Sequence, residues 1–120
     1  LFYRADLITA ELPVRRTLTQ AVQQASLPNE TWHAIGQCVG SLHARGVQHA
    51  DLNAHNLLVG ASNDIYVLDF DRGRIRARGA WERTVLARLR RSLQKVTCDL
   101  PAGRFTEAHW QALLAGAGTG

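Results

Sequence analysis

Polar side chains with distinct chemistry gather in one short segment, His49-Ala50-Asp51-Leu52-Asn53-Ala54-His55-Asn56, and Asp69-Phe70-Asp71 follows thirteen residues after Asn56. A carboxylate can orient a hydroxyl group and accept its proton, and carboxylate and amide oxygens are good ligands for Mg²⁺. Transfer of a phosphoryl group from ATP to a hydroxyl needs both functions. Asp51 as the base, with Asn56 and Asp69 as the metal ligands, would supply them.

Two short strands are predicted between these polar groups. Residues 57–59 and 65–68 are apolar and enclose a turn-forming segment at 60–64, a pattern typical of a β-hairpin. Residues 47–49, Val-Gln-His, lead into the polar segment and predict another short strand. Because a hairpin reverses the chain, we expect Asp69 to face the loop that carries Asp51 and Asn56.

Helical periodicity dominates the rest of the chain and predicts an α+β fold that is mostly helical. Helices are expected over residues 17–25, from about 30 to a left-handed cap at Gly46, over 81–96, and from an N-cap at Thr106. Residues 1–12 favour one or two short strands. The spacing of Gly36 and Gly40 favours close helix packing.

Aromatic and histidine residues on these helices have structural interpretations. We expect Trp32, Trp81 and Trp110 to anchor the core. We expect His33, His43 and His109 to be ordinary surface or boundary residues.

Length and composition predict one soluble globular domain. The 120 residues carry a formal charge of +4 and are 46% hydrophobic, and the two cysteines form no pattern typical of a disulfide framework or a zinc site. No secretion leader or membrane span is expected, and a reducing cytoplasm is the simpler compartment. The opening at Leu1 suggests a chain that starts within a larger protein.

Positive charge is concentrated in one segment. Of the 14 basic residues 13 are Arg, and eight of these fall between Arg72 and Arg91. Arginine suits phosphates and carboxylates, so an anionic partner is one interpretation. A solvated helix face is the other.

The order of these motifs resembles the protein-kinase-like fold, whose catalytic and metal-binding signatures are H-R-D-L-x-x-x-N and D-F-G. Ala50, Asn53 and Asp71 depart from the Arg, Lys and Gly of the protein kinases, so regulation by a phosphorylated activation loop is not expected. With Tyr3-Arg4-Ala5-Asp6-Leu7, Leu68-Asp69-Phe70-Asp71-Arg72-Gly73-Arg74 and Arg88-Leu89-Arg90-Arg91-Ser92-Leu93-Gln94-Lys95, the polar segment more closely resembles the lipopolysaccharide kinase family of Gram-negative bacteria.

This resemblance implies an ATP- and Mg²⁺-dependent enzyme. It would phosphorylate the 4-hydroxyl of 3-deoxy-D-manno-octulosonic acid (Kdo) on a lipid A precursor, as a peripheral protein at the cytoplasmic face of the inner membrane, with no nucleic-acid partner. The implied roles are catalysis for Asp51, binding of magnesium and nucleotide for Asn56 and Asp69, support for His49, Asn53 and Asp71, and substrate binding for Arg72 and Arg74.

The resemblance also divides the chain. Residues 1–12 would be the last strand and hinge of an N-terminal lobe, and 13–120 the C-terminal lobe. No glycine-rich loop precedes a strand, and the only lysine is Lys95. Without a phosphate-gripping lobe, this chain alone is expected to be weakly active or inactive.

Other interpretations remain open. Another small-molecule kinase of this fold, such as a heptose or aminoglycoside kinase, would share the loop. A degenerate lobe could bind anions without turnover. His49, Asp51 and His55 could instead ligate a metal, or the polar residues could merely cap turns.

Overall fold

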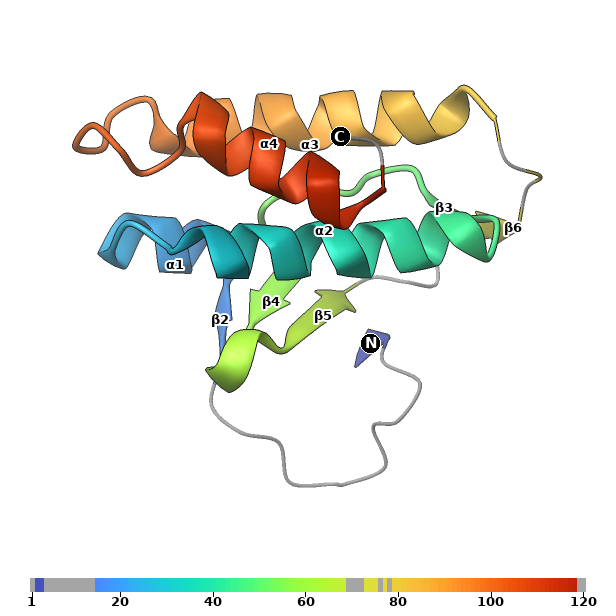
Figure 1. The fold of residues 1–120 in the computed structure, drawn as a ribbon, viewed down its shortest axis with the longest axis horizontal. Helices are drawn as coiled ribbons and strands as arrows, with labels where there is room; N and C mark the ends of the chain where they lie inside the picture. Colours follow the sequence, from blue (N-terminus) through green and yellow to red (C-terminus); the bar gives the residue numbers. More distant parts are fainter. Residues whose placement is uncertain (1, 4–14, 69–72, 76, 78, 119–120) are drawn as a thin grey trace.

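Helix α2 (Asn29–Ala44) runs through the middle of the molecule in the computed structural model, which describes residues 2–3, 15–68, 73–75, 77 and 79–118. Figure 1 shows α3 (Trp81–Thr97) and α4 (Glu107–Gly116) on one side of α2, and the larger β-sheet on the other. The short helix α1 (Leu18–Gln24) precedes α2. The observed class is α+β with a small antiparallel sheet, as predicted.

The predicted hairpin is confirmed. Strands β4 (Leu57–Val59) and β5 (Ile65–Leu68) pair antiparallel, with Leu57 opposite Val67. A 3-10 turn, η1 (Ala61–Asn63), joins them, with Ser62 and Asn63 in the left-handed region at φ 56° and 60°.

Two edge strands complete this sheet, in the order β1-β5-β4-β2. Strand β1 (Phe2–Tyr3) pairs with β5, and β2 (Arg16–Thr17) pairs with β4. A separate pair joins β3 (Val47–His49) to β6 (Gly73–Ile75). Apart from β1, the predicted strand and hinge of residues 1–12 lies outside the described residues.

The four predicted helices are present, and local capping sets their ends. Thr17 Oγ1 accepts a hydrogen bond from the Gln20 amide, and Gln20 Oε1 accepts one from the Thr17 amide, so a capping box starts α1. Gly46, two residues beyond α2, has φ 75°, as the left-handed cap requires. Thr106 caps α4 as expected.

Glycines let α2 and α4 approach closely, as their spacing predicted. A Cβ at Gly36 would lie 1.8 Å from the Leu113 carbonyl oxygen, and one at Gly116 would lie 2.1 Å from the His33 carbonyl oxygen. Real side chains cannot occupy such positions. The two backbones are therefore packed at a distance that only glycine permits.

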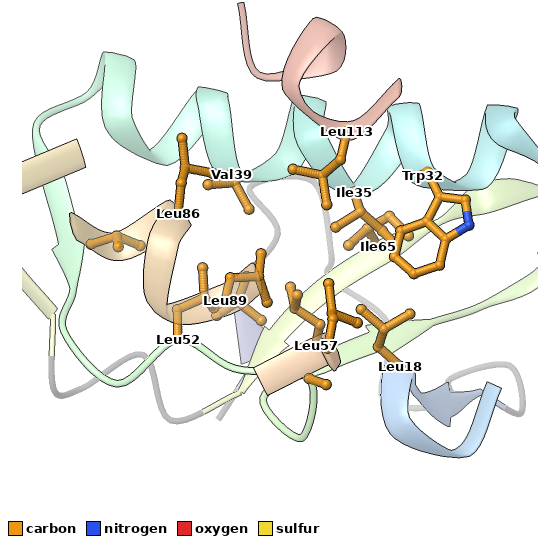
Figure 2. Close-up of a cluster of buried hydrophobic side chains, with 14 of the residues drawn as sticks. Leu18, Trp32, Ile35, Val39, Leu52, Leu57, Ile65, Leu86, Leu89 and Leu113 are labelled. Atoms are coloured by element: carbon orange, nitrogen blue, oxygen red, sulfur yellow. The ribbon is translucent and has the colours of Figure 1, made fainter. Parts of the chain in front are cut away.

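The core lies between α2, α3 and the hairpin (Figure 2). Leu57 from β4, Ile35 from α2 and Leu89 from α3 meet in it, and each is completely or almost completely buried. Trp32, Trp81 and Trp110 are 0%, 7% and 4% exposed, which confirms their predicted role as anchors.

Two of the three helical histidines are buried, contrary to the prediction that all three are surface or boundary residues. His33 is exposed, but His43 and His109 are 3% and 9% exposed. His43 lies edge-on to the Trp81 ring, with Nδ1 3.9 Å from Glu82 Oε1. His109 accepts a hydrogen bond at Nδ1 from the Thr106 amide. Burial is tolerated because each ring has a polar neighbour, a pairing that helical periodicity does not reveal.

Among the described residues, no helix combines the length and apolar character that crossing a bilayer demands.

Candidate active site

The segment between β3 and β4 alternates between core and surface. Leu52 and Ala54 are 1% and 0% exposed, whereas Asp51 and His55 are exposed. Figure 2 shows Leu52 among the core side chains near Leu89 of α3. Two buried side chains thus anchor residues 49–56, named the catalytic loop after their predicted role, and leave Asp51 and His55 at the surface.

Backbone groups of Ala54 tie the loop to two helices. Its amide donates to Ser92 Oγ of α3 at 2.8 Å, and its carbonyl accepts from the Thr19 amide of α1 at 3.2 Å. Thr19 Oγ1 also lies 3.0 Å from His55 Nδ1. The loop is therefore held on both sides by elements distant in sequence.

Asn53 organises the loop internally. Its Nδ2 donates to the Asp51 carbonyl at 2.9 Å, and its Oδ1 accepts from the His55 amide at 2.8 Å. The Asn53 amide donates to Asn56 Oδ1 at 3.1 Å. Asn53 thereby holds the backbone of Asp51 and the side chain of Asn56 in one arrangement.

The end of β5 is bound to the same loop. The Leu68 amide donates to the Asn56 carbonyl at 2.6 Å, and the Leu68 carbonyl accepts from His49 Nε2 at 3.0 Å. The His49 side chain is almost completely buried, as a bracing role requires. Because Leu68 immediately precedes Asp69, the chain enters the predicted metal-binding segment from a point fixed against Asn56.

Asp69, Asp71 and Arg72 lie outside the described residues. Arg74 lies in β6, where it is opposite Gln48 of β3, next to the pair formed by His49 and Gly73. Among the predicted residues, the structure brings together His49, Asp51, Asn53 and Asn56.

Residues not assigned a role from the sequence also belong to this site. Arg88 Nη1 lies 4.0 Å from Asp51 Oδ1, and about half of each side chain is exposed. Ser92 and Thr19 hold Ala54. Arg88, Ser92 and Lys95 recur at helical spacing along α3, a signal that one face of this helix could serve the loop.

The oxygen chemistry of the loop suits Mg²⁺. Asp51 has a carboxylate, and Asn56 has an amide oxygen, Oδ1, which accepts a hydrogen bond from the Asn53 amide. The alternative histidine metal site is not supported, because His49 and His55 are directed to Leu68 and Thr19. Within the described ranges, no three His, Cys, Asp or Glu residues are grouped to hold a metal.

Comparison with known proteins identifies the family. Residues 1–116 match the model of the Lipopolysaccharide kinase (Kdo/WaaP) family. The chain belongs to this family. Family relatives named 3-deoxy-D-manno-octulosonic acid kinase include proteins of Pasteurella multocida, 41% identical, and Photobacterium profundum, 38% identical. These alignments cover 96% and 97% of this chain and 49% of each relative, so the chain spans about half the length of these family members.

Proposed function

We propose that the protein containing this chain transfers the γ-phosphate of ATP to the 4-hydroxyl of Kdo on a lipid A precursor. The geometry of the catalytic loop carries this proposal. Asn56 is bonded through its carbonyl to Leu68, and His49 is bonded to the same residue. Asp69 therefore follows directly from a position held beside the loop that presents Asp51. Family membership and the names of the relatives support the same reaction.

In the proposed reaction, Asp51 orients the acceptor hydroxyl and takes its proton. The hydroxyl oxygen then forms a bond to the γ-phosphorus, and the bond from this phosphorus to the oxygen bridging it to ADP breaks. An exposed carboxylate whose backbone carbonyl is fixed by Asn53 is suited to this task. Proton acceptance by a positioned carboxylate contributes roughly 10²- to 10⁴-fold to such rates.

Asn56 and Asp69 are the proposed magnesium ligands. When bound, Mg²⁺ would neutralise charge on the phosphate oxygens. Asn53 keeps the Asn56 side chain oriented for this role, and His49 keeps the end of β5 in place.

The proposal also covers the kinase lobe that this chain would form and the cellular location of the enzyme. The chain would be the C-terminal lobe of a protein-kinase-like enzyme, with residues 1–12 leading from the N-terminal lobe. The enzyme would act as a peripheral protein at the cytoplasmic face of the bacterial inner membrane, where a lipid-linked acceptor is accessible from the aqueous side.

The decisive variant is Asp51→Asn in the intact protein that contains this chain. We expect kcat for phosphate transfer from γ-labelled ATP to a Kdo-bearing lipid A precursor to fall about 10³-fold, with little change in the melting temperature. The isosteric amide removes the base but keeps the shape of an exposed side chain. Asp99→Asn, at an exposed position two residues beyond α3, is the matched control and should retain full activity. Turnover above a tenth of wild type in Asp51→Asn would refute the assignment.

Acceptor choice separates the rival functions. Transfer only to a heptose-containing acceptor would indicate a different sugar kinase of this fold. Salt-sensitive binding to anionic lipid with no transfer to any acceptor would indicate a binding module.

A further inference from the structure

A groove of about 620 Å³ lies beside the catalytic loop, between it and α3. Asn53 and His55 line it from the loop, and Arg88, Arg91 and Lys95 line it from α3. The three basic residues are spaced by three and four positions, which puts them on one face of the helix.

Among the described residues, most of the positive charge in this groove has no carboxylate partner. Over the described ranges, neither Arg91 nor Lys95 has a carboxylate within 4.0 Å, and no acidic residue lines the groove. Arg90, which belongs to the adjacent face of α3, differs, because its Nη2 lies 2.5 Å from Glu107 Oε1. Basic side chains without carboxylate partners are suited to bind an anion from solution.

The groove is fixed relative to Asp51. Ser92 lies among the basic residues of α3 and accepts the hydrogen bond from the Ala54 amide. His55 is held by Thr19, and Arg88 reaches to 4.0 Å from Asp51. A group bound at Arg91 and Lys95 would therefore be held at a set position with respect to the carboxylate of Asp51.

We propose that this groove binds an anionic group of the acceptor, a phosphate or a carboxylate, and thereby holds the acceptor hydroxyl near Asp51. The inference rests on the proposed function of Asp51. It assigns acceptor recognition to Arg91 and Lys95 on α3, with Arg88 at the end of the groove nearest the base.

The test is the double variant Arg91→Gln/Lys95→Gln of the intact protein, compared with Arg45→Gln/Arg83→Gln. The control removes the same charge from exposed positions outside the groove. With the Kdo-bearing lipid A precursor, we expect KM for the acceptor to rise about tenfold in the groove variant, since charge-assisted hydrogen bonds are lost. KM for ATP should change less than about twofold, and the control should resemble wild type. An unchanged acceptor KM, or an equal rise in the control, would overturn the inference.

A second acceptor identifies the anion. If the groove binds lipid A phosphates, wild type should show the raised KM on a dephosphorylated acceptor, and the groove variant should add no further penalty. If it binds the Kdo carboxylate, the tenfold penalty should persist on the dephosphorylated acceptor. Either pattern supports the groove.

A binding measurement without ATP separates this inference from the proposed function. Phosphatidylcholine vesicles with and without the Kdo-bearing precursor serve as the probe. Wild type and the control should bind the precursor vesicles, and the groove variant should lose most of this binding. That result supports the groove even if wild type shows no transfer, which would refute the proposed function alone. Equal binding by all three proteins, or none by wild type, would overturn the groove.

Discussion

Ala54 has no side chain that could do chemistry, yet its backbone positions the catalytic loop. Its amide is bonded to Ser92 and its carbonyl to Thr19, and the residue is completely buried. A buried amide without an acceptor destabilises a fold more than an average hydrogen bond stabilises it. Ser92 therefore holds the backbone of the loop that presents Asp51, although it lies on another element.

Replacing Ser92 tests this dependence. Ser92→Ala leaves the Ala54 amide without its partner, and we expect the free energy of unfolding to fall by about 1 to 3 kcal/mol, measured by urea denaturation of the intact protein. We also expect kcat to fall, because the loop that presents Asp51 and Asn56 shifts. Ser92→Thr keeps the hydroxyl and should recover most of both losses. A kcat unaffected by Ser92→Ala would show that Asp51 is positioned without this bond.

Helices α2 and α4 pack closely against each other through glycine residues. Their glycines bring backbone against backbone, so that a Cβ at Gly36 would meet the Leu113 carbonyl. Replacing glycine by alanine inside an exposed helix normally stabilises it by about 1 kcal/mol. Here the close packing of α2 against α4 makes the same replacement destabilising.

We therefore expect Gly36→Ala to lower the free energy of unfolding by about 1 to 3 kcal/mol, as overpacking does. Ser41→Ala, at an exposed position of the same helix, should change it by less than about 0.5 kcal/mol. Thermal unfolding of the two variants gives the comparison. An increase in stability for Gly36→Ala would mean that α2 and α4 are further apart than the structure has them.

The protonation state of His109 makes the stability of the whole molecule depend on pH. Its ring stacks on Trp32 of α2 with centroids 5.3 Å apart, and its Nδ1 accepts the Thr106 amide hydrogen bond. Burial lowers the pKa of His109 below its ordinary value. Protonation would place a charge against the core and remove the acceptor at Nδ1, so the folded state favours the neutral ring.

Stability should depend on pH accordingly. Because the folded pKa is below the unfolded value of about 6.5, the contribution of neutral His109 is complete above that pH. It is lost as the pH falls below about 6.5 toward the folded pKa. We expect the free energy of unfolding to decrease between about pH 7.5 and 5.5, measured by urea denaturation. His109→Gln keeps a capping acceptor that does not titrate, and should show a flatter dependence. Equal slopes for both proteins would show that other groups cause the change.

Local patterns in the sequence were sufficient to predict the helices, the hairpin and the left-handed conformation of Gly46. They also indicated which loop carries the candidate catalytic residues. Each depends on neighbours a few positions away, such as the capping pair of Thr17 and Gln20. Asp51 and Asn56 were predicted for the same reason, since their spacing is short and their chemistry is specific, whereas the supporting roles of His49 and Asn53 were implied by the family resemblance.

Contacts between distant segments could be identified only from the tertiary structure. Periodicity identifies the apolar face of a helix but not the element that covers it. The bond from Ala54 to Ser92, the burial of His43 and His109, and the approach of Arg88 to Asp51 all join residues from different elements. The basic groove also depends on contacts between distant segments. Its charges were visible in the sequence, but only the packing of α3 against the catalytic loop brings Arg91 and Lys95 to the same side as Asp51.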